Sequence, residues 1–188
     1  MSVLAASTLG AAAFPTKTVP PSEYAESICT SSRDWARQIT ELEAVYDQAI
    51  AGAPDLGTKK ALAVDFVEDA IETTRSLVRR TDKAGTPDAR RGKLVARIFT
   101  SGYRDVRENF DDVLEAARDL PASDQAGFDA ALNELDAALD DATDEFGETI
   151  EDASNEFSRE LRTAFMATRA CLELHAVIPT PSTTTTVG

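Results

Sequence analysis

The stretch FDAALNELDAALDDATDEFGETIEDASNEFSREL, residues 128–161, decides the fold of this chain of 188 residues. Its apolar side chains recur about every 3.6 residues, which is the period of a straight α-helix rather than of a supercoiled one. The same line continues beyond this stretch to Cys171 and His175. The pattern therefore predicts one long last helix from about Ser123 to His175, either continuous or bent near Gly147.

Proline and glycine divide the preceding chain into three further helical segments. The joints are GAPDLG (52–57), AGTP (84–87) and LPAS (120–123). They predict helices over about 22–51, 58–83 and 87–119, the last with Thr86 as its cap and Pro87 in its first turn. Helices joined by short loops pack antiparallel. The expected fold is all-α, a coiled-coil-like antiparallel up-down four-helix bundle with a long last helix and with Trp35 in its core.

The ends of the chain differ from the predicted bundle domain, residues 22–176. Residues 1–21 are first apolar and rich in small residues, then polar and proline-rich. This order is typical of a signal peptide followed by a disordered leader, with cleavage expected near Phe14. Residues 177–188 predict a disordered tail rich in proline and threonine. We expect a secreted or envelope-associated protein with no transmembrane span in its mature chain.

The charge is strongly negative and unevenly distributed. The net charge is −14, and residues 119–158 contain 13 acidic residues and no lysine or arginine. Such a balance disfavours nucleic acid as a partner. Residues 75–97 are instead basic, and they predict a possible anion-binding surface at one end of the bundle, formed by Arg79, Arg80, Arg90 and Arg91. Its expected partners are an anionic envelope polymer, lipid headgroups or another protein; the alternative is a solvated face paired with acids.

The two cysteines, Cys29 and Cys171, should lie at the same end of such a bundle. Two cysteines in an exported protein usually form a disulfide. The alternative is a metal site in which both cysteines join His175 and a carboxylate, because cysteine and histidine four residues apart on a helix can share a metal.

The sequence lacks the residue sets of common enzymes. One histidine cannot supply the two Glu-x-x-His pairs of a di-iron bundle. The acidic run 140–151 has no glycine at the sixth position of an EF-hand loop. We therefore expect no enzyme and no cofactor, but an exported interaction protein. The alternative function is a small-ligand or metal-binding module.

Several segments resemble small exported proteins and lipoproteins of actinobacteria that are described as uncharacterised. They are YAESIC (24–29), Trp35, AGTPDARRG (84–92), LPASDQAGF (120–128) and the late Cys171. The resemblance implies an exported helical domain and pairing of Cys29 with Cys171, and it implies no activity. The chain departs from the lipoproteins because no cysteine precedes Cys29, so no lipid anchor is expected.

Overall fold

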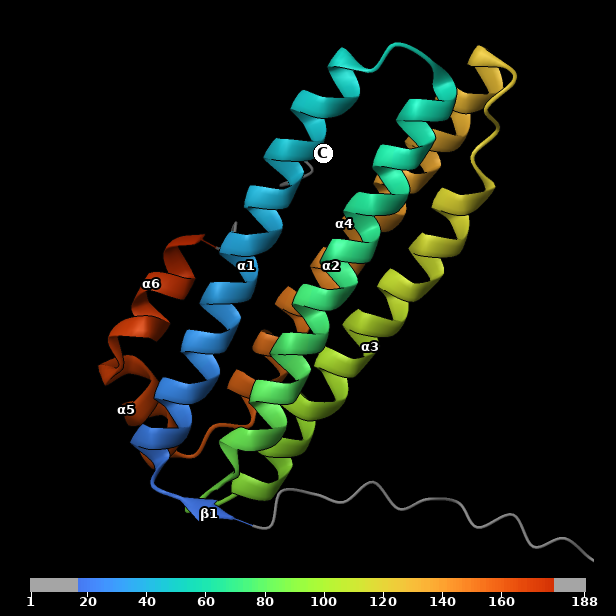
Figure 1. The fold of residues 1–188 in the computed structure, drawn as a ribbon. Helices are drawn as coiled ribbons and strands as arrows, with labels where there is room; N and C mark the ends of the chain where they lie inside the picture. Colours follow the sequence, from blue (N-terminus) through green and yellow to red (C-terminus); the bar gives the residue numbers. More distant parts are fainter. Residues whose placement is uncertain (1–16, 178–188) are drawn as a thin grey trace, which may run out of the picture.

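The computed structural model describes residues 17–177, and its side chains up to residue 174. Six helices dominate this part of the chain, and two strands of two residues accompany them. Figure 1 shows the four long helices lying side by side along a common direction. The bounds are β1 Thr18–Val19, α1 Pro21–Gly52, α2 Leu56–Ala84, β2 Thr86–Pro87, α3 Gly92–Asp119, α4 Gln125–Asn155, α5 Arg159–Ala167 and α6 Arg169–Val177. The all-α prediction is confirmed.

Local capping explains where the helices begin. The Asp55 side chain accepts a hydrogen bond from the Thr58 backbone N–H at 2.8 Å, and α2 starts behind it. Asp124 does the same for the Gly127 N–H at 2.9 Å at the start of α4. Each cap satisfies one of the N–H groups that a first helical turn leaves unpaired.

The predicted start of the third helix is wrong. Thr86 and Pro87 form β2, which pairs in parallel with β1, and α3 begins only at Gly92. The Thr86 N–H donates to the Lys17 carbonyl at 2.8 Å, so its backbone serves the strand pair rather than a helix. Glycine is required here twice: Gly85 has φ 86°, and a Cβ on Gly92 would lie 2.0 Å from the Pro87 carbonyl oxygen.

The prediction of one long last helix is also wrong. The chain leaves the helix after Asn155, and α5 and α6 fold back to pack on α1. Ser158 caps α5 by accepting from the Leu161 N–H at 3.4 Å, and Thr168 separates α5 from α6. Gly147, the predicted bend, lies inside α4. The reversal allows Leu161 and Cys171 to be buried against the main body instead of overhanging it.

One hydrophobic core includes side chains from all four long helices, but not every pair of neighbouring helices packs closely. Helices pack closely in the pairs α1–α2, α2–α3 and α3–α4, whereas the backbones of α1 and α4 stay further apart in the described chain. The rings of Trp35 on α1 and Phe146 on α4 bridge this gap, stacked with centroids 4.1 Å apart. Trp35 is only 3% exposed and donates from Nε1 to Thr74 Oγ1 at 2.9 Å, so its predicted place in the core is confirmed.

Candidate functional site

The gap between α1 and α4 forms an apolar groove of about 900 Å³. Its long walls come from α1 and α4, and α5 and α6 close it at the end that holds the disulfide. The apolar residues lining it are Ile28, Trp35, Ala36, Ile39, Phe99, Phe146, Ile150, Phe157, Phe165, Met166, Leu172 and Leu174. Small-molecule sites are typically hollows of about 300–1,000 Å³ with mainly apolar walls, and they often lie between the helices of bundles. The groove has both properties.

Helical spacing on α1 places one continuous stripe along the groove. The stripe includes Ile28, Ser32, Trp35, Ile39 and Glu43, which follow one another at intervals of three or four residues. Side chains at these intervals share one face of a helix. Because α1 rises about 1.5 Å per residue, the stripe from Ile28 to Glu43 is roughly 22 Å long. The groove is therefore elongated along the bundle.

Stacked aromatic rings make the floor rigid. Phe146 lies against Trp35 and also against Tyr103, whose ring centroid is 5.4 Å away. Nearer the disulfide end, Phe99 stacks on Phe165 with centroids 6.2 Å apart. Such ring pairs add to the stability gained from burying their area. The floor is thus fixed before any ligand arrives.

One buried polar pair is set into this floor. The Ser32 and Tyr103 hydroxyl oxygens lie 2.7 Å apart, and both side chains are fully buried. Burial raises the pKa of Tyr103, so the phenol stays neutral. Each hydroxyl has one proton and two acceptor positions, and their mutual bond leaves bonding capacity unused. The pair therefore lies beneath the surface of the groove, where it links α1 to α3.

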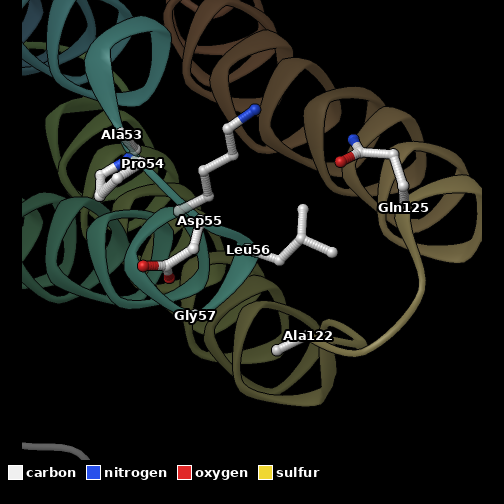
Figure 2. A pocket seen from close by; sticks show the side chains of 8 residues that line it. Ala53, Pro54, Asp55, Leu56, Gly57, Ala122 and Gln125 are labelled. Carbon is white, nitrogen blue, oxygen red and sulfur yellow. The ribbon is translucent and has the colours of Figure 1, made fainter.

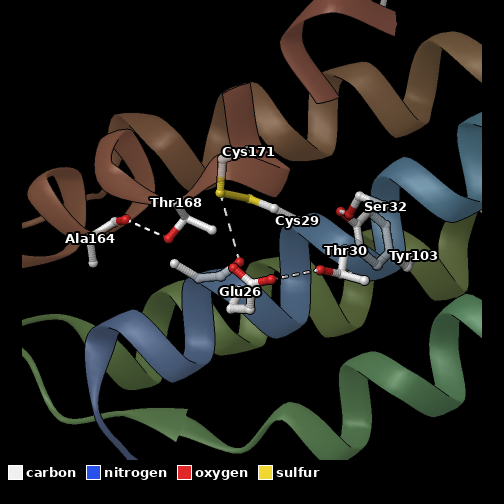
Figure 3. Close-up of a disulfide and its surroundings, with 9 residues drawn as sticks. Glu26, Cys29, Thr30, Ser32, Tyr103, Ala164, Thr168 and Cys171 are labelled. Carbon is white, nitrogen blue, oxygen red and sulfur yellow. Dashed lines mark hydrogen bonds between the residues drawn. A yellow bond between two sulfur atoms is a disulfide. The ribbon is translucent and has the colours of Figure 1, made fainter. Parts of the chain in front are cut away.

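The predicted disulfide is confirmed and forms part of the groove wall. The Sγ atoms of Cys29 and Cys171 lie 2.00 Å apart, and both cysteines are buried. Figure 3 shows the bond joining α6 to the face of α1, beside the Ser32–Tyr103 pair. Next to it, Arg33 donates to Glu173 at 2.7 Å, and Arg169 donates to the same carboxylate. These two arginines, Arg169 first, hold the pKa of Glu173 below its ordinary value.

The predicted metal alternative lacks its ligands. Both sulfur atoms are used in the disulfide, so neither is a thiolate. The side chain of His175 lies outside the described residues. Among the side chains that the structure does describe, no group of three or more histidine, cysteine or carboxylate residues could hold an ion.

The mouth of the groove is apolar at its disulfide end. Met166 on α5 is 70% exposed and Leu172 on α6 is 59% exposed, and both line the groove. Arg162, also exposed, lies at the same end, and its side chain takes part in no ion pair with a described residue. Exposed apolar side chains at a groove mouth are typical of a surface that receives a ligand.

The carboxylates of Asp144, Glu148 and Glu151 line the groove along α4, and the end opposite the disulfide is acidic as well. Glu43 lines it, and Asp47 on α1 and Asp140 on α4 raise the pKa of Glu43 further, after the larger effect of partial burial. Asp136 on α4 belongs to the same cluster, because its pKa is raised by burial and then by Asp140 and Asp47. Burial also raises the pKa of Tyr46 to about 12, with Asp136 and Asp47 contributing. Carboxylates of α1 and α4 thus interact across this end.

The predicted anion-binding arginines lie at the joint between α2 and α3, and most already have acidic partners. Arg79 pairs with Glu72 at 3.2 Å, and Arg80 pairs with Asp34 at 3.2 Å. Arg91 pairs with Glu156 at the end of α4. Arg90 lies near enough to Glu160 to help lower the pKa of that carboxylate. Arg79, Arg80 and Arg91 thus have the acidic partners that the alternative expected, and the anion-binding surface stays a prediction.

A second hollow of about 400 Å³ lies at the far end of the bundle, between the joint of α1 and α2 and the joint of α3 and α4. Figure 2 shows its surroundings, including Asp55, Leu56 and Gln125. Asp55 is occupied in capping α2, which lowers the pKa of its carboxyl. This hollow brings together no set of chemical groups comparable with those of the groove.

Comparison with protein-family models, curated proteins and solved structures found no match to this chain. No described helix has both the length and the apolar composition needed to cross a membrane. Function must therefore be argued from the geometry of the groove.

The sequence prediction did not identify the groove. It assigned the apolar lines of the first and last helices to a closed core. Trp35 and Phe146 do lie in the core, but helical spacing alone does not tell whether the first and last helices meet. Gly147 was the available signal. Glycine in a helix interior is unfavourable by about 1 kcal/mol relative to alanine, and here a Cβ on Gly147 would meet nothing within 4 Å. Gly147 lines the groove.

Proposed function

We propose that this protein is an exported, non-enzymatic module that binds an elongated apolar small molecule in the groove between α1 and α4. In this proposal the four long helices form an antiparallel bundle that is left open between its first and last helix. The single observation that carries the proposal is the groove itself, about 900 Å³ in volume and floored by Trp35, Phe146 and Phe99.

Two further features support binding rather than a defect of packing. The apolar side chains of Met166 and Leu172 remain exposed at the mouth, where water would otherwise favour their burial. Thr40, Thr143 and Ser154 place hydroxyl groups in the lining of the groove. A few fixed polar groups in an apolar wall are what orients a ligand in most small-molecule sites.

Export is supported by the disulfide and by the apolar leader. Disulfides persist in oxidising compartments and are rare in the cytosol. The Cys29–Cys171 bond lies within the wall of the groove, so the compartment that maintains the bond also maintains the site. We propose a location outside the cytosol, either secreted or associated with the envelope.

The test uses Trp35, which is the single tryptophan of the chain and lines the groove. Bromine on an alkyl chain quenches indole fluorescence at short range, so bromoundecanol is a suitable probe. We expect saturable quenching of the wild-type protein by bromoundecanol, and none by bromoethanol at the same concentrations.

A blocking variant and a matched control make the test specific. Gly147→Leu places a side chain in the open space of the groove and should abolish quenching while the helical signal stays unchanged. Gly52→Leu is the control, because a Cβ at Gly52 also meets nothing within 4 Å but lies at the end of α1 outside the groove. Equal quenching of both variants, or no quenching of the wild type, would overturn the proposed function.

A further inference from the structure

Two large apolar side chains are exposed close together on the pair of short helices α5 and α6. Met166 on α5 is 70% exposed and Leu172 on α6 is 59% exposed, and both line the groove. Val45, the other large apolar side chain exposed in the described chain, lies on α1 outside the groove lining. Neighbouring exposed apolar side chains mark contacts with a protein or a membrane, whereas a single one needs no explanation.

Arginines accompany this apolar pair on both helices. Arg159 and Arg162 lie seven and four residues before Met166, so all three share the exposed face of α5. Arg169 lies three residues before Leu172 on the exposed face of α6. Arg159 and Arg162 form no ion pair with a described residue, and Arg169, although paired within α6, keeps 90% of its side chain exposed. Their charges are therefore available to an anionic partner.

The opposite faces of α5 and α6 are fixed to the main body. Leu161 is fully buried, and the ring of Phe165 packs on that of Tyr24 on α1. The bond between Cys171 and Cys29 joins α6 to the same helix, as Figure 3 shows. The exposed side is thus held in place and points away from α1. We call it the basic–apolar face, and its members are Arg159, Arg162, Met166, Arg169 and Leu172.

We propose that the basic–apolar face docks on a membrane surface that contains anionic lipids. The planar guanidinium groups of arginine match the phosphates of lipid head groups, and Met166 and Leu172 enter the boundary between head groups and acyl chains. Basic residues beside exposed apolar ones are the composition of an interfacial site. A soluble polyanion would satisfy the arginines but leave the two apolar side chains in water, whereas an anionic membrane accommodates both.

The position of this face gives the docking a consequence for the groove. Arg162, Met166 and Leu172 belong to the lining of the groove as well as to the basic–apolar face. In the docked protein the mouth of the groove therefore opens towards the acyl chains. An apolar ligand then passes between membrane and groove without paying for exposure to water. This consequence rests on the proposed function, whereas the docking itself does not.

Nearby acids oppose the docking and limit its strength. Glu160 is exposed beside Arg159, and Asp144, Glu148 and Glu151 line the α4 side of the groove without an ion pair in the described chain. The whole chain carries a net charge of −14. Exposed charges are screened over about 8 Å at physiological salt, so arginines in contact with the lipids outweigh acids further from the surface. We expect reversible docking that weakens as salt is added.

The experiment measures flotation of the disulfide-bonded, full-length protein with vesicles. One set of vesicles contains phosphatidylglycerol and phosphatidylcholine in equal parts, and the other contains phosphatidylcholine alone. We expect flotation with the anionic vesicles at low salt, its loss at high salt, and little flotation with phosphatidylcholine alone. The apolar leader is the same in every variant, so binding through the leader would not respond to the substitutions. Equal flotation with both kinds of vesicle, or with neither, would overturn the proposal.

A charge variant and a matched control locate the docking surface. Arg159→Gln with Arg162→Gln should weaken binding about 25-fold, because one basic residue near an anionic surface contributes about fivefold, equivalent to about 1 kcal/mol. Lys59→Gln with Lys60→Gln removes the same charge from the start of α2, where Lys59 lines the hollow at the far end of the bundle. Equal losses in the two variants would mean that total charge, rather than this face, governs binding.

An apolar variant separates a membrane from a soluble polyanion. Met166→Ser with Leu172→Ser should weaken flotation at least about tenfold, since both side chains would lose their burial among lipids. Val45→Ser is the control, because Val45 is 67% exposed but lies outside the basic–apolar face. Unchanged flotation of the double serine variant would overturn membrane docking and leave only a polyanion site.

The acids of α4 provide a test in the opposite direction. Glu148→Gln with Glu151→Gln should strengthen binding to the anionic vesicles more than Asp112→Asn with Glu115→Gln, which removes two exposed charges from α3. An equal gain in both variants would contradict docking beside the groove. Quenching by bromoundecanol without vesicles tests the proposed function separately: quenching without flotation overturns only the docking, and flotation without quenching overturns only the ligand-binding function.

Discussion

Trp35 on α1 stacks on Phe146 of α4 with ring centroids 4.1 Å apart, across a gap that the two backbones do not close. Each ring also has a partner on a neighbouring helix. Trp35 donates to Thr74 on α2, and Phe146 stacks on Tyr103 of α3. The pair thus spaces the two helices rather than drawing them together, and the groove extends on both sides of it.

Gly147→Ala should stabilise the protein. The added Cβ meets no atom within 4 Å, so there is no packing conflict, and alanine is favoured over glycine in a helix interior by about 1 kcal/mol. We expect the free energy of unfolding in urea to rise by roughly 0.5–1 kcal/mol. A fall in stability would mean that α1 and α4 close over Gly147 in solution.

Removing the disulfide should weaken the attachment of α5 and α6. A bond that closes a loop of 142 residues contributes up to about 5 kcal/mol in the chain-entropy model, and often less. Replacing both Cys29 and Cys171 with serine should lower the melting temperature, with little change in helical signal at room temperature. Titration of the unreduced, unfolded wild-type protein should find no free thiol from this pair; stoichiometric alkylation would contradict the bond.

The Ser32–Tyr103 hydroxyl pair should behave as a coupled unit. Ser32→Ala leaves the buried Tyr103 hydroxyl without its partner, at a penalty of about 1–3 kcal/mol. Adding Tyr103→Phe removes the orphaned hydroxyl and should recover part of this loss. Denaturation of both single variants and the double variant checks the coupling. Additive losses would indicate that water or another group replaces the partner.

The helical content of this fold follows directly from the sequence, because apolar residues repeat with the helical period from α1 to α6. The break after Asn155 does not follow, for a physical reason. α5 keeps Leu161 and Phe165 in phase with the preceding apolar line, so the period continues although the chain reverses. The signal for the break was Ser158 as a cap with Glu160 in the first turn of α5, a weak pattern in a region so rich in helix formers.

The candidate site was harder to predict than the fold. The Cys29–Cys171 pair was predicted from an up-down arrangement with one long last helix, whereas in the structure it forms because α5 and α6 fold back onto α1. The groove depends instead on a gap between helices that are far apart in sequence, and apolar spacing is the same whether that gap is open or closed. The arginine pairs likewise depend on Asp34 and Glu156, acids from other helices that no local pattern connects to them.

The arginines at the joint of α2 and α3 give a test of the predicted anion-binding surface. Because Arg79, Arg80 and Arg91 already pair with acids, changing them together with Arg90 to glutamine should leave binding to heparin, used as a model polyanion, unchanged. Stability should fall only slightly, since exposed ion pairs contribute about 0–1 kcal/mol each. If the wild type binds heparin in a salt-sensitive way and this variant does not, the anion-binding surface is supported.

Stability should pass through a maximum at mildly acidic pH. Partial burial and neighbouring acids raise the pKa of Glu43, Asp136 and Glu145 in the folded state. A carboxyl with a raised folded pKa binds more protons folded than unfolded, so stability increases as pH falls through that raised value. The hydrogen bond from Ser158 lowers the pKa of Glu160. The hydrogen bonds from Arg169 and Arg33 lower the pKa of Glu173. Glu160 and Glu173 affect stability in the opposite direction. Their stabilisation is present above the ordinary carboxyl pKa and is lost as pH falls through their lowered folded pKa.

These two opposite effects should give the pH dependence of stability a rising part and a falling part. Melting temperature measured by circular dichroism from about pH 7 to about pH 3 should first rise and then fall. Glu43→Gln should flatten the rise in melting temperature, because glutamine does not titrate and the change removes one of the like charges that Asp47 and Asp140 oppose. Glu115→Gln, an exposed change on α3, should leave both parts in place. A melting temperature that only falls from neutral pH downward, or a rise that survives Glu43→Gln undiminished, would show that the carboxylates of α1 and α4 do not oppose one another across the groove.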